Sequence, residues 1–507
     1  MKKILISSLA LTGLLFTVSC NTDFERDVNN MTVSTGKADF SKFVSVGNSL
    51  TSGFRDGALY LDGQNESFPS MLAKQMALAG GTQTFTQPLM PNNVGGFTNI
   101  TGFGGKYTLQ LVDVKDASGS VVGKKLAPVQ STAAATLDII GGTGKYFNNM
   151  GVPGAKSYHL VASGYGSAVN LSLGKANPYF VRFATSATTS VLADAMAQKP
   201  SFYTLWIGNN DVLSYATSGG LGVDQKGNLD PSTYGSNDIT DPNVVASVIK
   251  NVILGLKSAN ANSKGAIANI PYVTSIPYFT AVPYNPVPLS SASASTLNTS
   301  FSAINAKLKS VGMAERFSTL TASTSNPVLI IDKSLTDISA YLPAQYAIYG
   351  QARHATANDL ILLPASSVIG IDPTTGLPPT STSTKINGVT IPLADQLVLT
   401  EKEAAKVIAA TDAYNASISS LATTYGLALV DANAKMKELG TTSGIQYNGV
   451  KYTASFVTGG AFSLDGVHPN GRGYAIIANT FIKAINNTYF STLPFVDINA
   501  YSGVTFP

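Results

Sequence analysis

The sequence is organised around the stretch Phe43-Val44-Ser45-Val46-Gly47-Asn48-Ser49-Leu50-Thr51-Ser52-Gly53. An apolar, β-branched run ends at Gly47, and a turn rich in Gly, Asn and Ser follows at once. Such a run is typical of a strand, and the turn would present Ser49 at the edge of a sheet. Two interpretations are open at this point. Ser49 is a nucleophile, or it is the N-cap of a helix that begins in the turn, which is a common use of serine.

The composition describes a long chain with little charge. Its 507 residues would suffice for about two or three average domains, or for one core with large insertions. Hydrophobic residues make up 44% and charged residues 12% of the chain, and 33 Lys and Arg stand against 29 Asp and Glu. Because the basic residues form no block interleaved with aromatic ones, nucleic acid is not expected as a partner.

The N-terminus has the pattern of a secretory signal. Lys2 and Lys3 give a positive start, an apolar run covers residues 4–18, and Ser19 precedes Cys20, the single cysteine of the chain. The apolar run is too short for a membrane-spanning helix. One thiol cannot form an internal disulfide, so Cys20 calls for another explanation.

A cysteine directly after a small residue resembles the lipobox of bacterial lipoproteins, which implies a signal peptide at 1–19 and a lipidated Cys20. Thr17 stands where this motif most often has Leu, and a plain cleaved signal is the alternative. Residues 21–25 resemble the acidic signal of surface-exposed lipoproteins of Bacteroidetes-type bacteria. We therefore expect a lipidated tether at 20–38 and an anchor in the outer membrane. We expect the protein at the cell surface, with a periplasm-facing or secreted protein as alternatives.

Strand and helix patterns alternate along the remaining chain. Strands are expected at about 42–46, 146–151, 202–208, 266–270, 328–332 and 427–431, and helices at about 67–79, 183–198, 244–256, 292–311, from Thr400 onward and 472–486. Most of the strands are apolar throughout, which indicates that both faces of the sheet are covered. This pattern predicts a three-layer α/β/α fold, a doubly wound, mostly parallel sheet with large loop and β-hairpin insertions.

Two long segments interrupt the alternation. Residues 107–111 alternate apolar and polar side chains and a turn at 117–120 follows, which predicts a β-hairpin. The second segment contains expected strands near 360–369 and 386–391. A stretch rich in Pro and aromatic residues after Pro271 would line an acyl pocket, act as a lid, or pack as a rigid loop.

A loop near the C-terminus supplies the residues that a serine nucleophile requires. It reads Ser463-Leu464-Asp465-Gly466-Val467-His468-Pro469-Asn470-Gly471, with an Asp three residues before a His. A serine hydroxyl needs a base to take its proton, and the base needs a carboxylate that orients it. His468 is the only one of three histidines with such a partner, so His159 and His354 are interpreted as ordinary polar residues.

The reaction also needs donors aimed at the developing oxyanion. Candidates are the backbone N–H groups of Ser49 and Gly154 and the side-chain amide of Asn210. Each of these residues follows an expected strand. In a doubly wound fold, function lies at the carboxyl ends of the strands, where all three residues are expected to meet.

Four blocks in chain order resemble those of the GDSL (SGNH) hydrolase family. They are Gly47–Leu50, Asn149–Gly154, Gly208–Asp211 and Asp465–His468. The resemblance implies Ser49 as nucleophile, His468 as base and Asp465 as orienting acid, with Ser49, Gly154 and Asn210 around the oxyanion. Asn48 replaces the family's usual Asp, and Asp211 is interpreted as structural.

The family core is about half as long as this chain. Insertions at about 82–145, 214–240 and 271–395 therefore lie outside the resemblance, within a hydrolase domain expected at 39–507. They would decide which substrate the protein accepts.

The resemblance implies a serine hydrolase that cleaves carboxylic esters through an acyl-enzyme on Ser49. Lipid acyl esters and acetylated glycans are the two substrate classes considered, and no cofactor or metal is expected. The alternative is a non-catalytic surface lipoprotein that binds glycan or lipid for an outer-membrane transporter.

Overall fold

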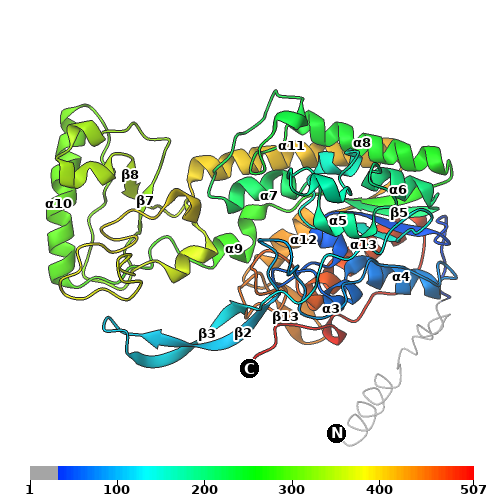
Figure 1. Ribbon diagram of the computed structural model, residues 1–507, viewed down its shortest axis with the longest axis horizontal. Helices are drawn as coiled ribbons and strands as arrows, with labels where there is room; N and C mark the ends of the chain where they lie inside the picture. The colour runs from blue at the N-terminus through cyan, green and yellow to red at the C-terminus, as the bar shows by residue number, and fades with distance from the viewer. Residues whose placement is uncertain (1–31) are drawn as a thin grey trace, which may run out of the picture.

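The structure is a computed structural model that describes residues 32–507 (Figure 1). The expected signal peptide, Cys20 and the tether up to residue 31 lie outside the described residues. The chain enters the fold beside the last helix, α13 (Gly471–Tyr489), where the Lys37 N–H donates to the Tyr489 carbonyl at 2.7 Å. Within residues 32–507, no helix is both long and apolar enough to cross a membrane.

A parallel sheet of five strands lies at the centre. Its spatial order is β11 (Ala428–Val430), β6 (Lys264–Ala268), β5 (Phe202–Trp206), β1 (Phe43–Gly47) and β4 (Asn149–Gly151). Counted along the chain this is the order 2-1-3-4-5 of a doubly wound fold, whose switch point lies between β1 and β5. Every residue of β1 and β5 is buried, since helices cover both faces. The predicted α/β fold is thereby confirmed.

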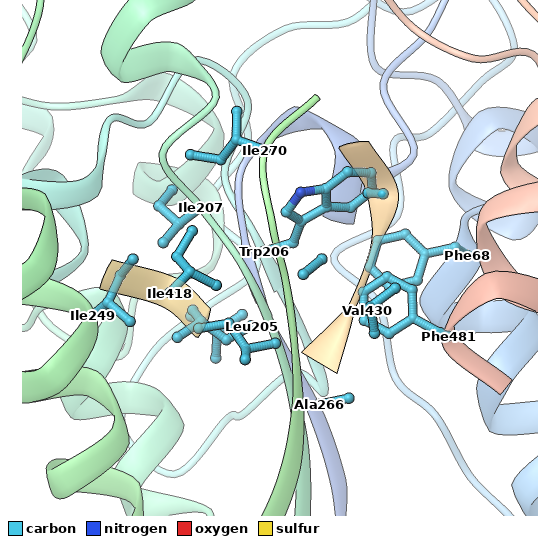
Figure 2. Packing of buried hydrophobic residues seen from close by; sticks show 14 of the residues in the cluster. Phe68, Leu205, Trp206, Ile207, Ile249, Ala266, Ile270, Ile418, Val430 and Phe481 are labelled. Carbon is cyan, nitrogen blue, oxygen red and sulfur yellow. The ribbon is translucent and has the colours of Figure 1, made fainter. Parts of the chain in front are cut away.

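Two helical layers enclose this sheet (Figure 1). One layer contains α4 (Phe68–Leu78) and α13, and the other contains α6 (Val191–Ala197), α8 (Pro242–Ala259) and α11 (Glu401–Tyr425). Figure 2 shows Phe68, Trp206 and Phe481 together on one face, with Ile249 and Ile418 on the other. The rings of Phe68 and Phe481 are stacked with centroids 4.7 Å apart, which joins α4 to α13.

The helix starts expected at Ser67 and Thr400 are confirmed by their caps, whereas the helix expected at about 183–198 begins only at Val191, after Ser190. The Ser67 hydroxyl accepts from the Ser70 N–H at the start of α4, and Thr400 forms a capping box with Glu403 at the start of α11. The apolar stripe of α11 that faces the sheet and α8 passes through Val407 and Tyr414, and it leaves Ile408 39% exposed.

The predicted hairpin is formed by β2 (Tyr107–Lys115) and β3 (Val121–Gln130), which pair antiparallel. It projects from the body on the same side as the insertion that follows Pro271 (Figure 1). Leu109 is buried at its base, whereas Leu111 is 57% exposed. The hairpin therefore packs against the core only at its base.

The insertion that follows Pro271 packs around two hydrophobic clusters of its own. One cluster contains Phe301 and Leu329, and the other contains Val328 and Ile361. It contains α9 (Pro277–Thr280), α10 (Ser291–Ser310), β7 (Leu329–Ile331), β8 (Ala352–His354), β9 (Leu360–Ile361) and, at its end, β10 (Val398–Leu399). β7 pairs with β8, outside the central sheet.

Two expected strands of this insertion are corrected. The strand near 360–369 ends at Ile361, and a 3-10 helix at Leu363–Ser367 follows, because Pro364 has no N–H to donate to a strand partner. Residues 386–391 form a tight turn and not a strand. The N–H groups of Thr390 and Ile391 both donate to the Ile386 carbonyl, and Gly388 has a φ of +73°.

The remaining elements lie around the sheet and in the connecting loops. They are α2 (Ser49–Ser52), α3 (Leu61–Asn65), α5 (Pro178–Phe183), α7 (Asn210–Thr217), α12 (Ala432–Leu439) and the short pair β12 (Ile445–Tyr447) and β13 (Val450–Tyr452). The helices α2, α7 and α12 begin within four residues of the carboxyl ends of β1, β5 and β11. Their first residues therefore meet at one edge of the sheet.

Candidate active site

Ser49 lies directly after β1, as the first residue of α2. The preceding residue caps this short helix: Asn48 Oδ1 accepts from the Leu50 N–H at 3.0 Å. The interpretation of Ser49 as N-cap is therefore wrong, and its hydroxyl is left for other partners. Gly47 permits the turn, since a Cβ there would lie 2.4 Å from the Trp206 carbonyl oxygen of the neighbouring strand. The turn thus needs glycine for close packing against β5.

The structure brings His468 and Asp465 to Ser49. His468 Nε2 lies 2.9 Å from Ser49 Oγ, and His468 Nδ1 lies 2.8 Å from Asp465 Oδ2. A carboxylate accepts hydrogen bonds, so the ring carries its proton on Nδ1 and leaves Nε2 free to accept from the serine hydroxyl. The Phe54 ring, with its centroid 4.8 Å from that of His468, packs against the imidazole. This is the arrangement that a nucleophile, a base and an orienting acid require.

Asp465 is held as a carboxylate by its own loop. Its Oδ1 accepts from the N–H groups of Val467 and His468 and from the Ser463 hydroxyl, at 2.8 to 3.0 Å. Burial alone would raise the pKa of Asp465. The attraction of His468 and these hydrogen bonds outweigh burial and lower the pKa to about 2. Asp465 is therefore charged wherever His468 acts as a base.

The turn that contains Asp56 and Gly57, which the sequence did not predict as part of the site, holds this loop in place. The Asp56 carboxylate accepts from the Leu464 N–H at 2.9 Å, and the Asp56 N–H donates to Ser463 Oγ at the same distance. The Gly57 N–H donates to Asp465 Oδ2. More than 400 residues separate the two sides, so no spacing in the sequence could reveal these contacts. The only local sign is a charged residue directly before a glycine, in the turn after the Ser49 helix.

The expected oxyanion donors follow β1, β4 and β5, which are adjacent strands. Asn210 is the first residue of α7, and its Nδ2 donates to the Ala155 carbonyl at 2.9 Å. This bond uses one of two amide hydrogens. Gly154, next to Ala155, has a φ of +80°. Across residues 32–507, the N–H groups of Ser49 and Gly154 donate to no backbone carbonyl of the turns and loops. One amide hydrogen of Asn210 and the N–H groups of Ser49 and Gly154 therefore have no partner among the described residues.

The other polar residues near these motifs have structural partners. Asp211 is fully buried and accepts from both the N–H and the hydroxyl of Ser157, at 2.8 and 2.7 Å. His159 Nδ1 accepts from the Lys156 N–H, and His354 Nδ1 accepts from the Ser318 N–H. Burial lowers the pKa of each histidine to about 4. Neither histidine bonds to Ser49 or Asp465.

An apolar hollow opens beside Ser49, His468 and Asn210. With its open mouth included, its empty volume is about 900 Å³. Pro271, Val273 and Ile276 contribute to its wall, so only the beginning of the Pro-rich stretch lines the pocket. Gly154 is not part of the lining.

No family model matches the chain, and no curated protein matches it. Among solved structures, the chain is similar to a candidate GDSL-like lipase from Parabacteroides merdae, with a TM-score of 0.30 and 10% identity over 89% of this chain and 99% of that chain. It is also similar to an alpha/beta hydrolase enzyme from the metagenome of Lake Arreo, Spain, with a TM-score of 0.31 and 10% identity over 89% and 96% of the two chains. At these values the two similarities do not bear on the activity of this chain, and the site geometry carries the functional argument.

Proposed function

We propose that this protein is a serine hydrolase that cleaves carboxylic esters through an acyl-enzyme on Ser49. The observation that carries the proposal is the unbroken line of hydrogen bonds from Ser49 Oγ through the His468 ring to Asp465. A pure binding protein has no use for a base held 2.9 Å from a serine hydroxyl and a carboxylate held behind that base.

In the first half of the reaction, His468 Nε2 takes the Ser49 proton as Oγ attacks the carbonyl carbon of the ester. The negative charge that develops on the carbonyl oxygen is received by the N–H groups of Ser49 and Gly154 and by Asn210 Nδ2. His468 then gives its proton to the alkoxide oxygen, and the alcohol leaves. Throughout this half, the charge of Asp465 stabilises the protonated imidazole.

In the second half, a water molecule replaces the alcohol. His468 takes a proton from that water as its oxygen attacks the acyl-enzyme, and the carboxylic acid leaves as Ser49 recovers its proton. Residues of this chain perform every proton transfer.

The proposal is tested with a fluorophosphonate probe and with nitrophenyl esters. We expect labelling at Ser49 that is lost on heat denaturation, and a fall of kcat in Ser49→Ala by about 10⁶-fold, the size known for removal of such a nucleophile. Ser366→Ala, an exposed serine of the insertion, serves as control and should label and turn over esters as the wild type does. Equal turnover by wild type and Ser49→Ala would overturn the proposal. Absence of both labelling and turnover would favour the non-catalytic lipoprotein.

The anchor proposed at Cys20 rests on the sequence alone and has its own test. Cells that express the protein are fed an alkyne analogue of palmitate, and the purified protein is examined for incorporation. We expect label in the membrane fraction of the wild type and none in Cys20→Ser. An unlabelled wild type recovered from the medium would favour the plain cleaved signal.

A further inference from the structure

The hollow beside Ser49 extends away from Ser49 and His468, between the short helix α12 and the last helix, α13. Its lining includes Met436 and Leu439 of α12 and Ile476 and Phe481 of α13, with Trp206 from the end of β5. Figure 2 shows Trp206 and Phe481 on the same face of the sheet. All five side chains are buried and apolar over most of their surface. A chain of methylene groups, and not a sugar, is the chemistry that such walls accept.

Residues of α13 from Gly473 to Thr480 line the hollow, a distance of roughly 10 Å at the helical rise of 1.5 Å per residue. Lys435, Ile476 and Thr480 also line a second hollow on the outer surface between α12 and α13. The inner hollow therefore begins at Ser49 and ends next to a surface groove.

We infer that this hollow between α12 and α13 binds the straight-chain acyl group of the substrate, so that the esters cleaved are medium- to long-chain fatty acyl esters. The inference rests on the proposed function, because it places the acyl carbon on Ser49. It selects the lipid class from the two that the sequence left open, since an acetyl group would leave most of the apolar lining without a partner.

The order of the reaction assigns the hollow to the acyl half and not to the alcohol half. The alcohol leaves before water enters, and an alcohol threaded between two helices would obstruct that step. The acyl group remains bonded to Ser49 until hydrolysis, so an enclosed apolar site suits it. Each methylene group that enters is removed from water, which corresponds to roughly a fourfold gain in kcat/KM per methylene.

The single tryptophan of the chain permits a binding test that needs no turnover. Trp206 lines the hollow, so its fluorescence reports on the occupant. In Ser49→Ala, titration with octanoate and dodecanoate should change the emission, with tighter binding for dodecanoate, whereas acetate should have no effect. Dodecanoate that leaves the emission unchanged would overturn the inference. This readout is independent of the proposed function, which could fail while the fatty acid still binds.

A turnover test uses two tryptophan substitutions on the same helix. Met436→Trp places an indole in the hollow, and Lys437→Trp places one on the exposed side of α12 as the matched control. For nitrophenyl esters, the ratio of kcat/KM on dodecanoate to that on acetate should fall at least tenfold in Met436→Trp and stay at the wild-type value in Lys437→Trp. An unchanged ratio in both variants would overturn the inference. A series of alkyl acetates varies the alcohol instead, and a kcat/KM that rises with the length of that alcohol would also overturn it.

If acetate and dodecanoate esters both resist hydrolysis by the wild type while fatty acids still quench Trp206, then the proposed function has failed and the acyl site stands. If short esters are hydrolysed and no fatty acid binds, then the proposed function stands and the acyl site has failed. The two proposals are therefore separated by the same pair of measurements.

Discussion

The Gly57 N–H donates to Asp465 Oδ2 at 2.9 Å, and this is the same oxygen that faces His468 Nδ1 at 2.8 Å. Gly57 belongs to the turn that follows the short helix of Ser49. The segment that contains Ser49 therefore also holds the carboxylate that faces His468. This hydrogen bond joins two residues that are 408 positions apart in the sequence, and it fixes the position of Asp465 relative to the turn that follows Ser49.

Gly57→Ala should lower kcat by about tenfold, the cost of one weakened hydrogen bond to a charged group. Gly57 has a φ of +74°, and a Cβ there would lie 2.6 Å from the Tyr107 ring, so the turn is strained at the residue whose N–H binds Asp465. Gly102→Ala introduces similar strain at a φ of +88° with no atom nearby, and it should leave kcat unchanged. Ester kinetics on both variants test this. An equal loss in both would show that general strain, and not the bond to Asp465, sets the rate.

Asp465→Asn should reduce kcat by about 10⁴-fold, because an amide facing Nδ1 favours the wrong tautomer of His468. The three residues act as a unit, so the double variant with Ser49→Ala should be no slower than Ser49→Ala alone. Single and double variants are compared on one nitrophenyl ester. Additive losses would contradict a shared role of Asp465 and Ser49.

The acidic limb of the rate profile should show one ionisation, that of a histidine base. Asp465 has a pKa of about 2, below its unfolded value of about 3.9, so its carboxylate stays charged above pH 4 and its stabilising effect is lost only as the pH falls through 2. Ester turnover should therefore decrease between about pH 8 and 5, the range in which histidine titrates. A flat profile of kcat/KM over this range would exclude a histidine base.

Asn210→Ala should lower kcat by about 10²- to 10³-fold with a smaller effect on KM, since its amide would meet the charge that develops in the transition state. Asn260→Ala is a matched control, because Asn260 Nδ2 likewise donates to a backbone carbonyl, that of Pro200, at the end of α8. Measuring kcat and KM for both variants distinguishes an oxyanion role from the loss of a structural hydrogen bond. A similar loss in Asn260→Ala, or a loss confined to KM, would contradict an oxyanion role.

The buried histidine of the insertion should make the protein sensitive to mild acid. Burial lowers the pKa of His354 to about 4, below its unfolded value of about 6.5, so the unfolded chain gains a proton that the folded chain does not. The free energy of unfolding should fall by about 2 kcal/mol between pH 7 and pH 5 from this group. Urea unfolding at both pH values, on the wild type and His354→Gln, measures the contribution. An identical pH dependence of the two proteins would contradict it.

Much of the core was predictable because its signals are local. The run at Phe202–Trp206 is apolar because both faces of its strand are covered, and Ser67 and Thr400 cap helices through neighbours three residues away. The insertion was less predictable. Its apolar residues pack in small clusters among turns, so residues 386–391 have the composition of a strand and the hydrogen bonds of a turn.

The sequence by itself determined the alternation of strands and helices, the fold class that follows from it, and the motifs that contain Ser49, Gly154, Asn210, Asp465 and His468. Local composition and short spacing are sufficient for these, because backbone periodicity and side-chain chemistry act over a few residues. Only the tertiary structure decided that Asn48 caps the helix after β1, that Asp56 and Gly57 hold the loop of Asp465, and that α12 and α13 enclose an apolar hollow beside Ser49. The cap of Asn48 is a local choice between neighbouring residues. The other relationships join distant parts of the chain, 408 residues apart for Gly57 and Asp465, and they form only when the sheet brings the ends of its strands together.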